Sequence, residues 1–150
     1  KICQDKAVNK NILHGLDLVV GNAEKLPFAD NSFDYYTIAF GIRNMLSIEN
    51  TLKEAHRVLK PTGKFLCLEF SQVQNELMKP LYDFYFFNVI PHIGKYVVNN
   101  KGAYQYLSES ISMFPNQEDF KTKIQNAGFM DVNYKNLTFG IAAIHYGYKI

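Results

Sequence analysis

The feature that most constrains this 150-residue chain is the run RVLKPTGKFLCLEFS at residues 57–71. A helical pattern comes to its end there, and Pro61 and Gly63 are expected to stop it. The apolar stretch that follows, over residues 65–70, carries the carboxylate of Glu69 near its end. Such a nearly continuous apolar run is typical of a strand that is buried on both faces of a sheet. The run therefore predicts a helix, a turn and a strand, which is the αβ unit of a nucleotide-type α/β fold.

The segments upstream extend this pattern. An apolar run at residues 16–20 predicts one strand, and the β-branched and aromatic residues 35–40 predict a second. Ser47 can cap a helix whose apolar positions recur at helical spacing as far as Leu59. With the strand at 65–70, the order is β, β, α, β, which is typical of a doubly wound sheet.

The C-terminal half is predicted to be mainly helical before it ends in a hairpin. Helical patterns cover residues 76–90, 104–113 and 117–127, and Gly128 closes the last of them. Residues 129–137 and 141–148 then read as an antiparallel strand pair that turns near Gly140.

Composition excludes several classes of protein. A chain in which 47% of residues are hydrophobic can bury a real core, about 70% of its unfolded surface. The net charge of +2 arises from scattered charges without a basic block, so nucleic acid is not an expected partner. No apolar run is long enough to span a bilayer, which favours a soluble or peripheral protein. Cys3 and Cys67 are expected to be reduced thiols, and no residue spacing predicts a metal site.

Two further motifs make the pattern more specific: NAEKLPFADNSFD at residues 22–34 and FGIRN at residues 40–44. Together with residues 57–71 they resemble the S-adenosylmethionine-dependent C-methyltransferases of ubiquinone and menaquinone biosynthesis. The signature of that family reads Arg-Val-aliphatic-Lys-Pro-Gly-Gly and ends Glu-x-Ser, and Thr62 stands where Gly or Met is usual. The resemblance runs on to Ile150. It implies a class I, Rossmann-like methyltransferase fold, S-adenosylmethionine as cofactor, and methyl transfer to a ring carbon of a polyprenylated benzoquinol or naphthoquinol.

The candidate cofactor residues follow predicted strands, where ligands bind in doubly wound sheets. By resemblance, Asn22 and Ala23 fall on the pair that contacts the adenine. From the residues alone, an Asn-type turn after a strand is the favoured interpretation of the same dipeptide. At Ala39 the family often carries a Ser that touches the cofactor, so any contact there is expected to come from the backbone.

Arg43 and Asn44 are the candidate catalytic residues. Gly41 is expected to allow a sharp exit from the strand and to place both side chains above the sheet edge. A guanidinium can stabilise the oxyanion that develops on a hydroquinol ring, or orient a water that removes the ring proton. The family carries Arg-Asn at this place. The alternative is a surface Arg43 paired with a carboxylate such as Glu49.

The candidate substrate residues are Glu69 and a group of aromatic and apolar side chains. Glu69 could hold a substrate hydroxyl or structure its own loop through a nearby donor. The aromatic stretch 81–90, with four residues of the later helices, could form the wall for a polyprenyl-substituted ring or a lip that faces a membrane. Core packing explains such a stripe as well. The named candidates are Tyr82, Tyr85, Tyr104 and Met113, with Tyr106 and Phe114 beside them.

The resemblance also has a gap. The family's glycine-rich cofactor loop, and the acidic residue that holds the ribose, have no counterpart here and would precede Lys1. We therefore interpret residues 1–150 as a partial methyltransferase domain with a helical substrate-side insertion at about 72–127. Family topology places the missing strands between residues 16–20 and 35–40. This chain alone is accordingly expected to bind S-adenosylmethionine weakly or not at all.

Several alternatives stay open at this point. The acceptor could be another lipid-like or aromatic molecule, or the chain could be a non-catalytic scaffold paired with an active subunit. A homodimer or a quinone-biosynthesis complex is compatible with the aromatic segment. The expected setting is the bacterial cytoplasm with peripheral membrane contact, or else the mitochondrial matrix.

Overall fold

The computed structural model describes residues 15–73, residue 80 and residues 101–150, and side chains from residue 106 onward in the last range. The predicted helix at 76–90, with Tyr82, Tyr85 and the aromatic stretch 81–90, lies outside the described residues. In the part of the chain that the structure describes, no helix is both long and apolar enough to cross a membrane.

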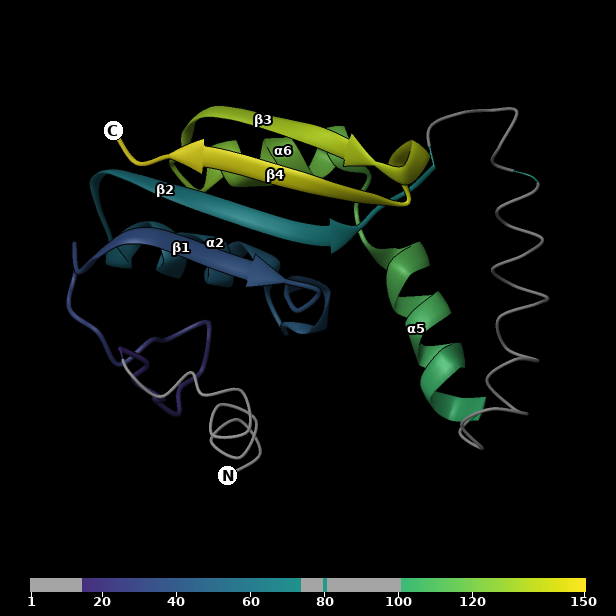
Figure 1. Ribbon diagram of the computed structural model, residues 1–150, viewed down its shortest axis with the longest axis horizontal. Coiled ribbons are helices and arrows are strands. Elements are labelled where there is room, and N and C mark those ends of the chain that lie inside the picture. Colours follow the sequence, from purple (N-terminus) through teal and green to yellow (C-terminus); the bar gives the residue numbers. More distant parts are fainter. Residues whose placement is uncertain (1–14, 74–79, 81–100) are drawn as a thin grey trace.

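A four-stranded mixed sheet forms the centre of the described structure (Figure 1). The strand order is β1-β2-β4-β3, in which β1 and β2 are parallel and the other two pairings are antiparallel. The predicted α/β fold and its C-terminal antiparallel pair are thus confirmed. The elements in chain order are β1 (Phe33–Ala39), η1 (Ile42–Asn44), α2 (Ile48–Val58), β2 (Leu59–Phe70), α5 (Lys101–Met113), α6 (Gln117–Asn126), β3 (Met130–Leu137), η3 (Thr138–Gly140) and β4 (Ala142–Tyr148).

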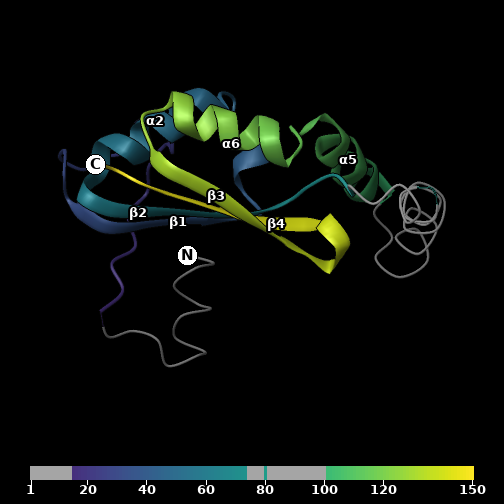
Figure 2. The same ribbon diagram turned by 90° about the horizontal axis from the view of Figure 1, so that it is seen from above.

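The core lies between the sheet and the two helices α2 and α6, which cover the same face of the sheet (Figure 2). Figure 1 shows α5 beyond the ends of β1 and β2, toward which both strand arrows point. Apolar side chains from every layer meet in one buried cluster, which removes them from water and supplies the main driving force for folding. The cluster comprises Ile42, Leu52, Ala55, Leu59, Phe65, Cys67, Phe114, Phe120, Ile124, Phe129 and Val132.

Helix α2 begins where the sequence predicts. The Ser47 side chain accepts a hydrogen bond from the Asn50 amide at 3.1 Å, which satisfies one of the unpaired donors of the first turn. Leu52 and Ala55 are fully buried on the face that meets the sheet. The helix ends at Val58, however, and Leu59 already belongs to β2. The prediction that Pro61 and Gly63 stop the helix is therefore wrong.

Residues 60–63 form an irregularity inside β2 instead. Phe33 pairs with Leu59 but Tyr35 pairs with Lys64, so β2 carries extra residues opposite β1 at this point. Gly63 is required there, since a Cβ atom at this position would lie 2.8 Å from the Lys60 carbonyl oxygen. The chain can then leave the helix directly into the strand without a separate turn.

Burial of β2 on both faces is also not what the structure shows. Along β2, from Gly63 to Phe70, fully buried residues alternate with half-buried ones. The helices α2 and α6 cover one face, whereas no described helix lies over the other (Figure 2). A continuous apolar run shows that both faces of a strand carry apolar side chains, but it does not show that other elements cover both faces.

The predicted strand at residues 16–20 is absent, and these residues are irregular and exposed. Leu16, Leu18, Val19 and Val20 have exposed fractions from 44% to 100%. A strand needs a neighbour for its hydrogen-bond ladder, and among the described strands β1 pairs only with β2. Apolar composition alone therefore does not make this segment a strand.

The C-terminal hairpin turns through η3. Phe139 and Gly140 have φ angles of +59° and +94°, the left-handed conformation that permits the tight reversal between β3 and β4. Gly128 has φ of +103° and closes α6, as predicted from its position after residue 127.

Candidate functional site

The chain leaves the carboxyl end of β1 through a sharp change of direction and enters η1. The positive φ lies at Phe40, at +52°, whereas Gly41 has φ of −124°. The prediction that Gly41 makes the sharp exit is therefore wrong, and Phe40 adopts the left-handed conformation. Its ring packs on Phe70 at 4.8 Å between centroids, a contact that holds the turn against the end of β2.

Arg43 and Glu69 meet at the ends of β1 and β2. The Arg43 Nη1 atom lies 2.7 Å from Glu69 Oε1, and the two side chains are 9% and 1% exposed. The same guanidinium nitrogen donates to the Phe40 carbonyl oxygen at 2.9 Å, and the guanidinium carbon lies 5.4 Å from the Phe70 ring centroid. Arg43 is thus held in place by a carboxylate, a carbonyl and an aromatic ring.

The predicted alternative, an ion pair between Arg43 and a carboxylate, is present, but the partner is Glu69 and the pair is buried rather than at the surface. Glu49 does not reach Arg43 and instead forms an ion pair with Lys123 of α6. Glu69 also accepts the Phe70 amide at 2.9 Å, so its carboxylate structures the exit of β2. The contacts therefore show that Glu69 structures its own loop. A direct contact between Glu69 and a substrate hydroxyl stays a prediction.

Asn44 connects η1 to α5. The Tyr106 hydroxyl donates to Asn44 Oδ1 at 2.8 Å, although the two residues are 62 positions apart in the sequence. An open cleft of about 320 Å³ lies between these elements, and Met113 is one of its exposed walls. Its lining residues are Arg43, Ile48, Tyr106, Glu109, Ser110, Met113 and Phe114.

The structure thus brings together part of the predicted site. Arg43, Tyr106, Met113 and Phe114 line one cleft, and Asn44 bonds to one of its walls. The side chain of Tyr104 belongs to the part of α5 that is not described. The cleft combines a cation with apolar and aromatic walls, which suits an aromatic ring that carries an oxygen.

Asn22 and Ala23 form the tight turn that the sequence allows. Asn22 Oδ1 accepts the Glu24 amide at 2.9 Å, and the Asn22 carbonyl oxygen accepts the Lys25 amide at 2.9 Å. The turn is exposed at Asn22 and half-buried at Ala23. It is therefore an Asn-type turn whose backbone is accessible to a ligand. Ala39, at the end of β1, is likewise exposed.

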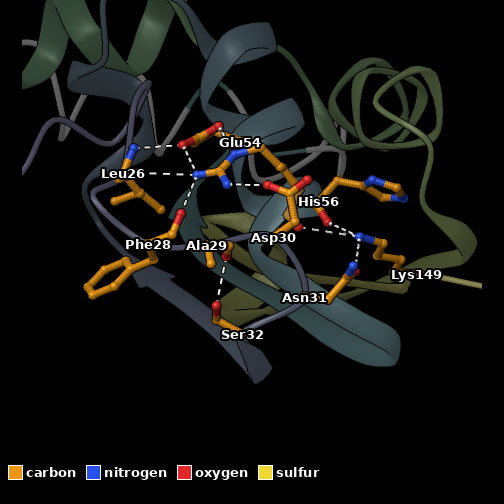
Figure 3. Close-up of polar contacts among 10 residues, drawn as sticks. Leu26, Phe28, Ala29, Asp30, Asn31, Ser32, Glu54, His56 and Lys149 are labelled. Carbon is orange, nitrogen blue, oxygen red and sulfur yellow. Dashed lines mark hydrogen bonds and ion pairs between the residues drawn. The ribbon is translucent and has the colours of Figure 1, made fainter.

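Residues 22–32 have little regular structure, and contacts with α2 hold them in place. Arg57 donates to the carbonyl oxygens of Leu26 and Phe28 at 3.3 and 2.9 Å, and its guanidinium pairs with Glu54 and Asp30. Glu54 Oε1 also accepts the Leu26 amide at 2.7 Å (Figure 3). The hydrogen bond from Arg57 lowers the pKa of the Glu54 carboxyl.

A lysine from the other end of the chain completes this contact. Lys149 donates to Asn31 Oδ1 and to the His56 carbonyl oxygen, both at 2.9 Å (Figure 3). The sequence reasoning missed the roles of Glu54, Arg57 and Lys149. Glu54 and Arg57 lie three residues apart on a helix, a spacing that favours an ion pair and could have identified them.

The cofactor that the resemblance implies can be tested against the residues present. The exposed turn at Asn22 offers backbone and amide groups of the kind that bind an adenine edge, and Ala39 lies exposed at the end of β1. These groups fit one side of an S-adenosylmethionine site. The 320 Å³ cleft is lined by neither Asn22, Ala23 nor Ala39, so these residues and the cleft form separate surfaces.

Comparison with known protein families gives one match that covers almost the whole chain. The model of the ubiE/COQ5 methyltransferase family matches residues 1–149. Two relatives illustrate the similarity. The ubiquinone/menaquinone biosynthesis C-methyltransferase UbiE of Rickettsia prowazekii is 57% identical over 145 residues, which are 97% of this chain and 58% of that protein. The mitochondrial 2-methoxy-6-polyprenyl-1,4-benzoquinol methylase of Mus musculus is 57% identical over 150 residues, or 46% of its length.

Solved structures share the fold at much lower identity. A SAM-dependent methyltransferase from Aquifex aeolicus superposes with a TM-score of 0.63 at 16% identity and covers 97% of this chain and 61% of its own. The [4+2]-cyclase SpnF gives a TM-score of 0.68 at 14% identity, over 99% of this chain and 61% of that one.

This chain spans 58% of the length of the relative from Rickettsia prowazekii and 60% of the length of the relative from Rickettsia felis. Within that span, the matched residues include the turn at Asn22, the Arg43-Asn44 pair and the run at 57–71. From the family match over residues 1–149 and the identity to these relatives, the chain belongs to the ubiE/COQ5 methyltransferase family.

Proposed function

We propose that this protein transfers a methyl group from S-adenosylmethionine to a ring carbon of a polyprenylated benzoquinol or naphthoquinol. The observation that carries the proposal is the family match across residues 1–149, because it covers both the cofactor-side turn and the substrate-side cleft. The fold alone carries less weight, since one of its structural neighbours is named as a cyclase.

Arg43 has the central role on the substrate side. When bound, S-adenosylmethionine supplies the methyl group on a sulfonium. Loss of a hydroxyl proton to water leaves negative charge on a ring oxygen and makes the ring carbon nucleophilic, and the Arg43 guanidinium stabilises that charge at the wall of the cleft. The ring carbon exchanges its own proton, which is lost to water, for the methyl group. Glu69 and Phe70 fix the guanidinium in advance, so that little reorganisation is needed during the reaction.

Asn44 and the aromatic wall position the ring. The Tyr106 hydroxyl donates to Asn44 Oδ1 and so fixes the orientation of the Asn44 side-chain amide. Met113 and Phe114 add apolar surface for a ring and the start of its polyprenyl tail. The Asn22-Ala23 turn contributes adenine contacts, and Ala39 contributes its backbone. Glu69, Tyr82, Tyr85 and Tyr104 stay predicted substrate contacts.

Another lipid-like or aromatic molecule is the alternative methyl acceptor. The cleft recognises an oxygenated aromatic ring and an apolar substituent, and these features do not separate a ubiquinone precursor from a menaquinone precursor or from another lipid-like phenol. The proposed setting is the bacterial cytoplasm, with the mitochondrial matrix as the alternative, because the relatives include bacterial proteins and one named as mitochondrial.

The proposal is tested by ligand binding and methyl transfer. We expect a version of the chain extended at its N-terminus to the length of its relatives to bind S-adenosylmethionine by calorimetry. It should also transfer a labelled methyl group to a short-chain polyprenyl hydroquinol. The 150-residue chain alone should bind much more weakly. Absence of both binding and transfer in the extended protein would support the scaffold alternative instead.

Arg43 provides a sharper test of the chemistry. Removal of one positioned donor to an oxyanion lowers kcat by about 10²- to 10³-fold, and we expect a loss of this size for Arg43→Met combined with Glu69→Gln. The double variant removes both members of the buried pair, so that no unpaired charge remains to unfold the protein. Arg43→Lys keeps the positive charge and should retain more activity. Full activity of the double variant would exclude a role for Arg43 in charge stabilisation.

A further inference from the structure

Contacts near both ends of α2 hold residues 22–32 against the helix. Near its C-terminal end, Glu54 and Arg57 bind the stretch from Leu26 to Asp30 (Figure 3). Near its N-terminal end, Glu24 Oε1 accepts the backbone amide of Ser47 at 3.0 Å. The second contact is a single hydrogen bond, but it lies between the two halves of the proposed site.

The position of Glu24 in the chain explains its importance. Glu24 immediately follows the Asn22-Ala23 turn, and its own amide closes that turn on Asn22 Oδ1 at 2.9 Å. Ser47 lies three residues beyond Asn44, and its side chain caps α2. One half-buried carboxylate therefore joins the end of the cofactor-side turn to the end of the segment that carries Arg43 and Asn44.

The chemistry of the contact suits a carboxylate. Backbone amides at the start of a helix lack partners within the helix and carry partial positive charge, so a negatively charged acceptor there forms a stronger bond than a neutral one. The Ser47 side chain already serves the Asn50 amide. The Ser47 amide itself is satisfied by a residue 23 positions earlier in the sequence, which is not needed for an ordinary helix cap.

We propose that Glu24 is a positioning residue that sets the Asn22-Ala23 turn relative to the Arg43-Asn44 segment. The proposal rests on the proposed function, since it assumes that the turn contacts S-adenosylmethionine. Methyl transfer requires the donor and the acceptor to be held at near-attack distance, and a shift of about 1 Å between two parts of a site can reduce the rate markedly. A direct bond between the two parts limits such a shift.

The chain offers a matched control at Glu49. Glu49 is a carboxylate in the first turn of α2. It pairs with Lys123 on α6 and hydrogen-bonds the Ser47 side chain, but it makes no described contact with residues 22–32. Glu49→Ala and Glu24→Ala therefore both remove a negative charge from the same helix end. Only Glu24→Ala releases the turn. Glu24→Gln keeps an oxygen acceptor at the same position and serves as the conservative variant.

The test measures S-adenosylmethionine affinity in the N-terminally extended protein. Loss of a hydrogen bond to a carboxylate corresponds to about a tenfold change in a binding constant, and we expect the Kd of Glu24→Ala to rise by about that factor. Glu24→Gln should restore most of the affinity, and Glu49→Ala should match the unsubstituted protein. An unchanged Kd for Glu24→Ala, or an equal loss in Glu49→Ala, would overturn the proposal.

A second readout is independent of cofactor binding. The backbone amide of Ser47 should shift in the ¹H–¹⁵N spectrum of Glu24→Ala and exchange faster with solvent. In Glu49→Ala its exchange should stay slow, because the Glu24 carboxylate still accepts that amide. If the extended protein does not bind S-adenosylmethionine at all, the proposed function fails. If it binds and Glu24→Ala shifts the Ser47 amide without a change in Kd, the contact exists and the positioning role fails.

Discussion

Thr62 has a strained backbone conformation that hydrogen bonds with Lys149 hold in place. It has φ of +68°, a conformation that is strained for a β-branched residue and open to glycine. Its amide donates to the Lys149 carbonyl oxygen at 2.7 Å, and the Lys149 amide returns a bond to the Gly63 carbonyl oxygen at 3.0 Å. These two bonds hold the irregular start of β2 and fix the backbone at this position.

We therefore expect Thr62→Gly to stabilise the protein. Relief of the left-handed strain is worth about 1–2 kcal/mol, and the greater freedom of glycine in the unfolded chain offsets part of it, which leaves a gain of about 1 kcal/mol. The urea midpoint measures this gain. Thr62→Ala is the control, because alanine keeps the Cβ atom and should show no such increase. Equal stabilisation by both substitutions would attribute the effect to the lost hydroxyl.

His145 is a buried titratable group that the proposed reaction does not use. It lies on β4, only 2% exposed, with its ring 4.8 Å from that of Phe120 and 5.2 Å from that of Tyr134. Burial lowers its pKa below the ordinary 6.5, against smaller opposing effects that include a hydrogen bond to the Gln117 carbonyl oxygen. Of the charged groups on α6 that act on it, Glu118 raises the pKa and Lys121 lowers it.

A dependence of stability on pH follows from this shift. The unfolded chain takes up a proton at His145 as the pH falls through 6.5, while the folded protein does so only at lower pH. Stability should therefore decrease from about pH 7.5 to about pH 5.5, and His56, whose pKa is also lowered by burial, contributes in the same direction. Urea unfolding of the protein and of His145→Gln at both pH values measures the difference. We expect a weaker dependence in the variant, and an equal dependence would exclude His145 as a source.

At the scale of elements, helix α2 orders a long irregular segment as well as covering the sheet. Its inner face supplies Leu52 and Ala55 to the core, and its outer and end residues bind residues 22–32. Segments without regular structure must satisfy their backbone polar groups individually. Here the guanidinium of Arg57 donates hydrogen bonds to two of the backbone carbonyl oxygens. The signature Arg is thus a structural residue in this protein.

We expect Arg57→Ala to loosen residues 22–32 without unfolding the sheet. Limited proteolysis should cleave this segment faster, while the circular dichroism of the sheet and helices stays close to that of the unsubstituted protein. Arg57→Lys keeps the charge but not the planar fork, so it should restore only part of the protection. Acid should have a similar effect, because the Glu54 pKa is lowered from 4.5 and its stabilising contact is lost as the pH falls through the folded value.

At the scale of the whole molecule, the described helices leave one face of the sheet open (Figure 2). Register and burial place half-buried or exposed apolar side chains there from β1, β2 and β4. Tyr35 is 68% exposed, and Lys64 lies 5.2 Å from the ring centroids of both Tyr146 and Tyr148 on this face. Exposed aromatic and apolar side chains gathered on one face promote association.

The 150-residue chain on its own should accordingly self-associate or bind a hydrophobic dye. Tyr35→Glu places a charge on the open face, at the edge strand β1, and should lower the mass measured by light scattering. Leu46→Glu is the control, since Leu46 is 99% exposed but lies in the loop before α2. A monomeric protein that binds no dye would show that this face does not drive self-association in solution.

Local sequence signals were sufficient for most elements of the fold. The Ser47 cap, the apolar spacing of α2 and the glycines at 128 and 140 each act through contacts within a few residues, so they predict elements correctly. The strand at residues 16–20 failed because a strand requires a partner that may lie anywhere in the chain. The end of α2 was misplaced because pairing with β1 extends β2 back to Leu59, past Pro61 and Gly63.

For the site, the sequence by itself determined the family and the chemical character of the candidate residues, because motifs such as Arg43-Asn44 are contiguous. Only the tertiary structure decided their partners. Glu69 rather than Glu49 pairs with Arg43, Tyr106 reaches Asn44 across 62 positions, and Glu24 binds the Ser47 amide. The physical reason is that hydrogen bonds and ion pairs depend on distances of about 3 Å in space, which separation along the chain does not encode.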